Sequence, residues 1–429
     1  MASDVYQEFE WRGMVHEGTE GVREALAREK VTCYIGFDPT AASLHVGSLL
    51  PLMALARMQR FGHSPIAIAG GGTGMVGDPS GKTQERQLLS LDRIGENLEG
   101  IRAQLARFLD FDAPSNPARI VNNADWLATL NLMAFLREIG KHFTVNGMLA
   151  RESVKRRLES EDGISYTEFT YSLLQAYDYL VLFDRFRCTL QLGGSDQWGN
   201  IVSGADLIRK LRGAKAHGLV MPLVTTASGV KFGKTEAGAV WLDPALTSDF
   251  RFYQFWLNTD DRDAVKYLKF FTFLAEPEVA ALAGQLAAAP EKRVAQRELA
   301  REVTRLVRGE EAVARAERAS GILFGGSLAG ARADEVLEVF ADVPSTEVAA
   351  SRFEEPGLAI AELVALTGLA RSKGEAARAI KGGGIYLNDG RVADERGRVT
   401  LGQAIDGRLF VLRKGQRNRH VVRVRHDRG

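Results

Sequence analysis

Residues 31–48 read VTCYIGFDPTAASLHVGS, and this stretch decides the fold. The first seven of them are mostly apolar and rich in β-formers, which predicts a buried strand over 31–37. The DPT that follows breaks the strand, and apolar residues at helical spacing then predict a helix over 45–60. A second strand is predicted at IAIA, residues 66–69. Strand, helix and strand in this order indicate a parallel α/β sheet.

The composition is that of a globular protein. The chain has 429 residues, 45% hydrophobic and 25% charged, so two to four domains are expected and fibrous or disordered chains are excluded. Two cysteines, Cys33 and Cys188, are too few for a disulfide scaffold and show no zinc-ligand spacing. The start, MASDVYQEFEWRG, does not resemble a signal peptide, and no apolar run is long enough for a bilayer. We therefore predict a cytoplasmic protein without membrane contact.

Charge is distributed unevenly along the chain. The formal net charge is +1, but residues 351–429 hold 16 Lys/Arg against 9 Asp/Glu, a net of +7. The preceding residues therefore carry −6. An acidic body with a basic end suggests a polyanionic partner.

Residues 96–180 and 250–320 have mostly helical patterns, and residues 325–355 are interpreted as a connecting segment. In the basic end, SKGE at 372–375 fits a capping box and predicts a helix from Lys373. Asp389-Gly390 then predicts a tight hairpin turn after a short strand. The end of the chain is thus expected to be a small separate α+β unit.

Several motifs are ambiguous when taken alone. GTGMVG at 72–77 has the G-x-G-x-x-G spacing of a dinucleotide site, but DPSG follows where such a site needs a helix. A flexible glycine turn whose backbone lies close to a ligand is therefore favoured. GDPSGKT at 77–83 and GVKFGKT at 229–235 have one residue too few between glycines for a P-loop. Lys231 and Lys234 can converge on one anion, and His45 opens a helix whose N-terminus attracts phosphate.

The combination of motifs is specific. DPTAASLHVGS, GDPSGK, YSLLQAYD, QLGGSDQWGN and KFGKT occur in this order along the chain. The chain resembles the bacterial tyrosyl-tRNA synthetases, a family of class I aminoacyl-tRNA synthetases, from about residue 5 to the C-terminus. YSLLQAYD and QLGGSDQWGN distinguish this family from other class I enzymes. HVGS departs from the usual HIGH-type motif at Ser48, where the family pattern has a second histidine.

The resemblance implies both a fold and a domain order. The expected fold is α/β, with a parallel-sheet, Rossmann-like catalytic domain, an α-helical domain and a small α+β S4-like RNA-binding domain. The implied bounds are 1–245 for the catalytic domain with its helical insertion, 246–325 for the helical tRNA-binding domain, 326–355 for a linker and 356–429 for the S4-like domain.

The resemblance also implies the activity, which is ligation of tyrosine to tRNA(Tyr) by way of tyrosyl-adenylate. The implied catalytic residues are Thr40, His45, Lys231, Lys234 and Thr235. The implied tyrosine-binding residues are Tyr34, Asp78, Tyr171, Gln175, Asp178 and Gln197. The implied ATP-binding residues are Gly36, Asp38, His45, Gly47, Ser48, Gly194, Asp196 and Lys234.

ATP is implied as a substrate that Mg²⁺ accompanies, with no dedicated metal site, and a homodimer is implied. The expected tRNA-binding residues of the basic end are Arg371, Lys373, Arg378, Lys381, Arg413, Lys414, Arg417 and Arg419. Two alternatives remain open from the sequence: an RNA-binding protein that has the synthetase body but not its catalysis, and a ligase for another aromatic amino acid, chiefly tryptophan.

Overall fold

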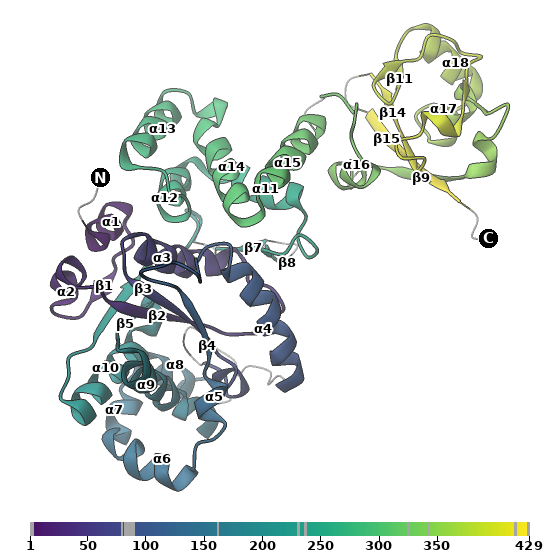
Figure 1. Ribbon diagram of the computed structural model, residues 1–429. Helices are drawn as coiled ribbons and strands as arrows, with labels where there is room; N and C mark the ends of the chain where they lie inside the picture. The colour runs from purple at the N-terminus through teal and green to yellow at the C-terminus, as the bar shows by residue number, and fades with distance from the viewer. Residues whose placement is uncertain are drawn as a thin grey trace. The chain divides into compact units, whose positions relative to one another are not determined.

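The computed structural model describes residues 4–78, 80, 91–160, 163–229, 232–235, 238–323, 326–341, 343–415 and 418–426. The chain divides into two compact units (Figure 1). The first unit comprises Met1–Ser248 and Phe255–Gly309, and the second comprises Asp249–Gln254 and Glu310–Gly429. Each unit is described by itself.

A six-stranded sheet forms the centre of the first unit, in the order β1-β6-β5-β2-β3-β4. The strands are β1 (Glu17–Gly18), β2 (Thr32–Phe37), β3 (Ser64–Ala69), β4 (Arg119–Asn122), β5 (Cys188–Gly194) and β6 (His217–Met221). All neighbouring pairs are parallel except β1 with β6. The predicted parallel α/β sheet is therefore confirmed, and β4 is a strand that the helical interpretation of 96–180 missed.

Helices cover both faces of this sheet. Figure 1 shows α3 on one side and α9 with α10 on the other. The helices before the sheet's last strand are α1 (Val5–Arg12), α2 (Val22–Arg28), α3 (Leu49–Arg60), α4 (Leu91–Leu105), α5 (Ala124–Leu127), α6 (Leu132–Glu138), α7 (Val145–Leu149), α8 (Glu152–Leu158), α9 (Tyr166–Phe186) and α10 (Trp198–Arg212). The predicted helix over 45–60 starts as a short 3-10 turn, Val46–Ser48, and continues as α3. Nearly every residue of α3 is buried, as expected of a helix that crosses between parallel strands.

The predicted helical stretch after residue 250 is also helical in the structure. It contains α11 (Asp249–Leu257), α12 (Asp261–Phe271), α13 (Glu276–Ala288), α14 (Val294–Arg308) and α15 (Glu310–Leu323). In α14 the apolar stripe of Leu299, Val303 and Val307 is buried, and Gly309 caps the helix in a conformation that favours glycine (φ 89°). In the division into units, α15 belongs to the second unit.

The second unit is built on a five-stranded sheet in the order β12-β11-β14-β15-β9. Its strands are β9 (Ser345–Ala349), β11 (Ile385–Leu387), β12 (Gly390–Arg391), β14 (Leu409–Lys414) and β15 (Asn418–Arg425), and β10 (Leu358–Ala359) pairs separately with β13 (Arg398–Val399). Its remaining helices are α16 (Ala333–Val339), α17 (Ile360–Leu366) and α18 (Lys373–Lys381). The helix predicted from Lys373 is α18, capped by the Ser372 hydroxyl, which accepts the Glu375 N–H. The hairpin turn lies one residue earlier than predicted, because Asn388 and Asp389 adopt positive φ (45° and 69°).

The segment interpreted as a connection contains two regular elements in the structure. Strand β9 pairs in parallel with β15, so residues 345–349 join the sheet through a partner more than seventy positions away. Helix α16 and Phe340 pack on the same sheet, with Val336 and Phe340 buried against Val411 and Val421. Residues 333–341 and 343–349 therefore belong to the packed core of the second unit and do not form a free linker.

Candidate active site

A cavity of about 620 Å³ opens where β2, β3, β5 and β6 end. Ligands of parallel α/β sheets bind at this carboxyl edge. Most of the predicted tyrosine- and ATP-binding residues line the cavity, namely Tyr34, Gly36, Asp38, His45, Gly47, Asp78, Tyr171, Gln175, Asp178, Gly194, Asp196 and Gln197. Segments from residue 34 to residue 197 thus meet in one place.

The other predicted residues of this site lie outside the cavity lining or outside the described side chains. Thr40 is exposed in the loop after β2, and Ser48 is half-buried at the start of α3. Lys231 lies outside the described residues. For Lys234 and Thr235 only the backbone is described, and it pairs as β7 with Gly238–Ala239, the strand β8.

The deep end of the cavity is formed by Asp178 and Tyr34, both buried. One Asp178 oxygen accepts the indole N–H of Trp126 at 2.7 Å, and the other accepts the amide of Asn123 at 2.9 Å. The Tyr34 hydroxyl is buried and has no hydrogen-bond partner among the described residues. A buried hydroxyl without a partner is costly, so this group is available to a polar ligand atom.

The protonation of this pair is perturbed. Burial raises the pKa of the Asp178 carboxyl to about 7, although the hydrogen bonds from Asn123 and Trp126 oppose the rise. Burial, followed by the nearby Asp178 carboxylate, raises the pKa of the Tyr34 phenol well above its ordinary value. The deep end therefore presents a neutral phenol beside a carboxyl group that titrates near neutrality.

The raised pKa predicts a pH-dependent stability that Asp178→Asn removes. From about pH 4 to about pH 7 the folded protein keeps a proton on Asp178 that the unfolded chain has lost. The free energy of unfolding of the wild type, relative to the variant, should therefore fall as pH rises through this window, by at most about 1.4 kcal/mol per pH unit. Above about pH 7 the difference should be constant.

Urea unfolding of both proteins between pH 4 and 8, followed by fluorescence, measures this difference. Two stability curves that run parallel across the whole range would contradict the pKa assigned to Asp178.

A chain of side-chain hydrogen bonds lines the middle of the cavity. Asp78 accepts the amide of Gln197 at 2.7 Å, and the Gln197 carbonyl accepts the Gln175 amide at 3.2 Å. The second Asp78 oxygen accepts the backbone N–H of Ser80 at 2.8 Å. The carboxylate and the amides are thus held in fixed orientations on residues from three separate segments.

The outer end of the cavity contains the HVGS motif. His45 caps the 3-10 turn, and its Nδ1 accepts the Gly47 N–H at 2.9 Å. This bond requires Nδ1 without a proton, so in the neutral ring the proton lies on Nε2. A Cβ at position 47 would lie 2.6 Å from the His45 ring, so any other residue there would displace the ring from this position.

The KFGKT loop packs against this motif. Phe232 is buried among aromatic rings and stacks on Phe271 at 5.2 Å between ring centroids. Gly233 has φ +82°, and a Cβ on it would lie 2.8 Å from the Val46 side chain and 3.2 Å from the Gly47 N. The backbone around Lys234 therefore comes within van der Waals distance of the HVGS turn.

The polar residues of the site that escaped the sequence analysis include three that are buried. Asn123 and Trp126 hold Asp178, and the buried Gln191, whose Oε1 has no partner in the described chain, lines the cavity. Asn123 and Trp126 follow the strand β4, which was not predicted, so their approach to Asp178 had no local signal. Gln191 stands first in QLGGSDQWGN, and its place on a buried strand was the only available signal.

Comparison with known proteins identifies the family. Residues 26–325 match the family model of the class I tRNA synthetases (W and Y). Residues 335–422 match the model of the SYY-like C-terminal domain of tyrosine–tRNA ligase. The tyrosine–tRNA ligase of Roseiflexus castenholzii is 57% identical over 98% of this chain and 99% of its own length. The chain belongs to the tyrosine–tRNA ligases. Membership makes it a class I aminoacyl-tRNA ligase.

Other relatives in this family agree. The tyrosine–tRNA ligase of Opitutus terrae is 50% identical over 98% of this chain and 99% of its own length. A C-terminally truncated mitochondrial tyrosyl-tRNA synthetase of Aspergillus nidulans superposes with a TM-score of 0.68 at 32% identity, covering 75% of this chain and 95% of that one. The tyrosine–tRNA ligase C-terminal match begins at 335, inside α16, and so includes residues that had been interpreted as a linker.

The second unit carries the cations that the resemblance to tyrosine–tRNA ligases connects with tRNA. Lys373 pairs with Glu362 at 2.7 Å, Lys381 with Glu395 at 3.0 Å and Lys414 with Glu375 at 3.1 Å. Arg371 and Arg378 are exposed and form no ion pair with another described side chain. Carboxylates of the same unit therefore compete with phosphates for the three lysines, whereas the side chains of the two arginines are available to phosphates.

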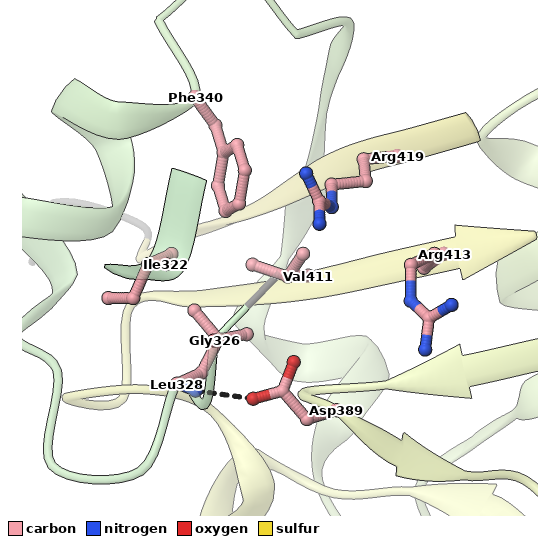
Figure 2. Close-up of a pocket in the computed structure, with 8 residues that line it drawn as sticks. All are labelled: Ile322, Gly326, Leu328, Phe340, Asp389, Val411, Arg413 and Arg419. Carbon is pink, nitrogen blue, oxygen red and sulfur yellow. Dashed lines mark hydrogen bonds between the residues drawn. The ribbon is translucent and has the colours of Figure 1, made fainter. Parts of the chain in front are cut away.

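Two further arginines lie on one face of the second sheet. Tyr386, Arg413 and Arg419 stand opposite one another across β11, β14 and β15. Arg413 stacks over the Tyr386 ring at 3.8 Å, and Arg419 lies 5.3 Å from the Phe340 ring. Figure 2 shows both arginines among the residues that line a small recess, together with Val411 and Asp389. Arg417 lies outside the described residues.

Proposed function

We propose that the chain activates L-tyrosine with ATP, forming tyrosyl-adenylate and pyrophosphate, and then transfers tyrosine to the 3′ end of tRNA(Tyr). The observation that supports this most directly is the buried pair of Tyr34 and Asp178 at the deep end of the cavity, with the HVGS turn at its outer end. A phenol fits the deep end of the cavity, because its hydroxyl can donate a hydrogen bond to Asp178 and can donate to or accept from the Tyr34 hydroxyl.

The middle of the cavity suits the α-amino and carboxylate groups of the amino acid. Asp78, Tyr171 and Gln175 are proposed to hold the ammonium group, since a carboxylate, a phenol and an amide carbonyl all accept its protons. Gln197 lies beside Asp78 and is proposed to contact the substrate carboxylate. Its amide nitrogen carries two protons, so it can donate one to that carboxylate while the other stays on Asp78.

ATP is proposed to bind at the outer end. Gly36, Asp38, Gly47, Ser48, Gly194 and Asp196 are proposed to contact the nucleoside and its α-phosphate. Thr40 and His45 are proposed to face the pyrophosphate from one side, with Lys231, Lys234 and Thr235 on the other. Mg²⁺ is proposed to arrive with the phosphates of ATP.

The chemistry of the first step requires positioning more than proton transfer. The tyrosine carboxylate, with an ordinary pKa near 3.5, is ionised at neutral pH and attacks the α-phosphorus. One new C–O–P bond forms while the bond from the α-phosphorus to the bridging oxygen breaks, and pyrophosphate leaves with that electron pair. Cations and N–H donors that face the leaving group stabilise this growing charge.

The basic second unit is proposed to bind the tRNA. Its net charge favours contacts with phosphates, which release counterions and weaken as salt rises. For the domains we propose the catalytic, helical and S4-like order of the family. A cytoplasmic location is proposed because both cysteines are free and buried, as in reducing compartments, and the curated relatives named above are bacterial. Among the described helices, none has the length and apolarity to cross a membrane.

A homodimer is proposed on the distribution of exposed apolar side chains. Of the eleven large apolar residues that are exposed in the described chain, seven fall between 132 and 166. They are Leu132, Met133, Leu136, Val145, Leu149, Leu158 and Tyr166. Clustered exposure of this kind is typical of a surface that a second copy covers.

Tyr166→Asp is expected to convert the dimer to monomers. The Tyr166 side chain is 74% exposed at the start of α9, so the change should leave the fold intact and put a charge into an apolar interface. Sedimentation velocity should show a dissociation constant raised by on the order of 100-fold. Leu246→Asp, at an exposed leucine outside the segment, is the control and should remain dimeric.

Amino-acid-dependent ATP–pyrophosphate exchange, measured with each of the twenty amino acids, tests the proposed function. Exchange with tyrosine alone supports it. Exchange that depends on tryptophan would indicate the alternative ligase, and binding of RNA without any exchange would indicate a protein that has lost catalysis.

A further inference from the structure

The loop that leads to the KFGKT motif is fastened to helix α12 by polar contacts. Asp263 accepts the backbone N–H of Ala227 at 2.6 Å. The carbonyl of Thr225 accepts Lys266 Nζ at 3.0 Å and the Tyr267 hydroxyl at 3.3 Å. Three side chains on successive turns of one helix thus hold the loop four to six residues before Lys231, the first of its predicted phosphate-binding lysines.

The far limb of the same loop is fastened to the same helix by packing. Phe232 lies 5.0 Å from Tyr267 and 5.2 Å from Phe271, the latter ring being nearly coplanar at 9°. Its N–H points to the carbonyl of Val224 at 3.4 Å, which links the two limbs. Next to it, Gly233 contacts Val46 of the HVGS turn, so α12, the loop and that turn form a continuous chain of contacts.

The other end of α12 is held firmly. Arg12 and Arg57, both buried, donate to the carbonyls of Lys269 and Thr272 at the C-terminus of the helix. Buried guanidinium groups that satisfy carbonyls in this way have few alternative partners. Helix α12 is therefore a fixed base for the loop, and Arg57 joins it to α3, which begins directly after the HVGS turn.

Asp263 is the contact in this set with the most specific chemistry. Its side chain is only 5% exposed, whereas Thr225 and Ala227 are exposed. Its second oxygen accepts Lys266 at 2.9 Å, so one carboxylate orders both the loop amide and the lysine that holds the loop carbonyl. Without Asp263, the exposed amide of Ala227 can bond to water, so the loop should lose its position while the rest of the fold remains.

We propose that Asp263 is a positioning residue that holds residues 225–229 where the KFGKT motif can grip the triphosphate of ATP. The proposal rests on the function proposed above. Asp263 acts through Ala227 and Lys266 and does not itself touch substrate. Its effect should appear in the use of ATP and in the rate of adenylate formation, and tyrosine should bind as before.

The test compares Asp263→Ala, Asp263→Asn and the wild type in single-turnover formation of tyrosyl-adenylate. Asp263→Ala should raise the apparent Kd for ATP, lower the rate constant of adenylate formation, or do both. The rate constant divided by this Kd should fall by about tenfold, the loss expected for a hydrogen bond to a charged group. The Kd for tyrosine, from equilibrium dialysis without ATP, should stay within about twofold. Asp263→Asn keeps an acceptor for Ala227 and should recover most of the loss.

Asp261→Ala is the matched control, because Asp261 lies in the same first turn of α12 but accepts from Gln296 on α14. It should behave as the wild type in both measurements.

Hydrogen exchange of residues 224–232 gives a second readout without catalysis, and Asp263→Ala should speed exchange there without doing so in β2 or β5. The proposal would be overturned if Asp263→Ala weakened the binding of tyrosine as much as the use of ATP, or if it left the use of ATP unchanged. A wild type without tyrosine-dependent ATP–pyrophosphate exchange would instead overturn the proposed function.

Discussion

Asp178→Ala is expected to weaken the preference for tyrosine over phenylalanine strongly. In the wild type the carboxylate lies at the deep end of the cavity, together with the Tyr34 hydroxyl, for which the described part of the chain provides no hydrogen-bond partner. Phenylalanine offers the Tyr34 hydroxyl no partner and leaves Asp178 with only its bonds from Asn123 and Trp126, so the hydrogen bonds that a phenol would form are missing. Without the carboxylate this penalty largely disappears, and the ratio of kcat/KM values for the two amino acids should fall by on the order of 100-fold.

The measurement is ATP–pyrophosphate exchange with tyrosine and with phenylalanine over a range of concentrations. Asp178→Ala also removes the acceptor of Trp126 and Asn123, so thermal unfolding must show that the variant is folded at the assay temperature. Asp184→Ala is the control, because Asp184 lies on the same helix but pairs with Arg212 at the surface. A variant that remains folded and keeps its full preference for tyrosine would remove Asp178 from the substrate pocket.

The parts of this site that sequence could predict are those that lie next to a strand or helix end in the chain. Asp38 and His45 follow β2, and the apolar runs on either side of them have clear periodicity, so their place at the sheet edge could be predicted. Asp178 could be placed in the pocket only through the resemblance of YSLLQAYD. Its position on a long helix with apolar residues all around fits an ordinary buried aspartate equally well.

The parts that escaped prediction depend on contacts between distant segments. Asn123 meets Asp178 across 55 positions, and it follows a strand of four residues that is mostly half-buried. Strand β9 joins its sheet only because β15, near the end of the chain, provides an edge beside it. Short strands of this kind form through tertiary pairing, and their own residues give little indication of it.

Pairing of β9 with β15 also determines how the C-terminal unit can be removed. Cutting at residue 356 would take away β14 and β15 and leave Val336, Phe340 and Val348 without their buried partners. The exposed apolar surface would then promote aggregation for reasons unrelated to RNA. The appropriate truncation ends after Leu323, since it removes the whole second sheet and keeps α15, whose Ser320 bonds Gln254 on α11.

A chain of residues 1–323 is expected to form tyrosyl-adenylate at close to the full-length rate and to charge tRNA on the order of 100-fold more slowly at limiting tRNA. The cavity and its contacts lie entirely within the first unit, so the first step should be independent of the removed residues. The tRNA step loses the cations of the basic end, among which the exposed side chains of Arg371 and Arg378 form no ion pair with a described carboxylate.

Two measurements distinguish a loss of RNA contacts from a loss of folding. Salt should reduce kcat/KM for tRNA steeply in the full-length chain and much less in the truncated one, because fewer counterions are released. The full-length double variant Arg371→Glu with Arg378→Glu should reproduce part of the defect, while Arg332→Glu with Arg352→Glu, which changes the same charge on the same unit, should charge tRNA as the wild type does. Charging by 1–323 at the full-length rate would show that the first unit alone binds the tRNA, and the basic end would then need another explanation.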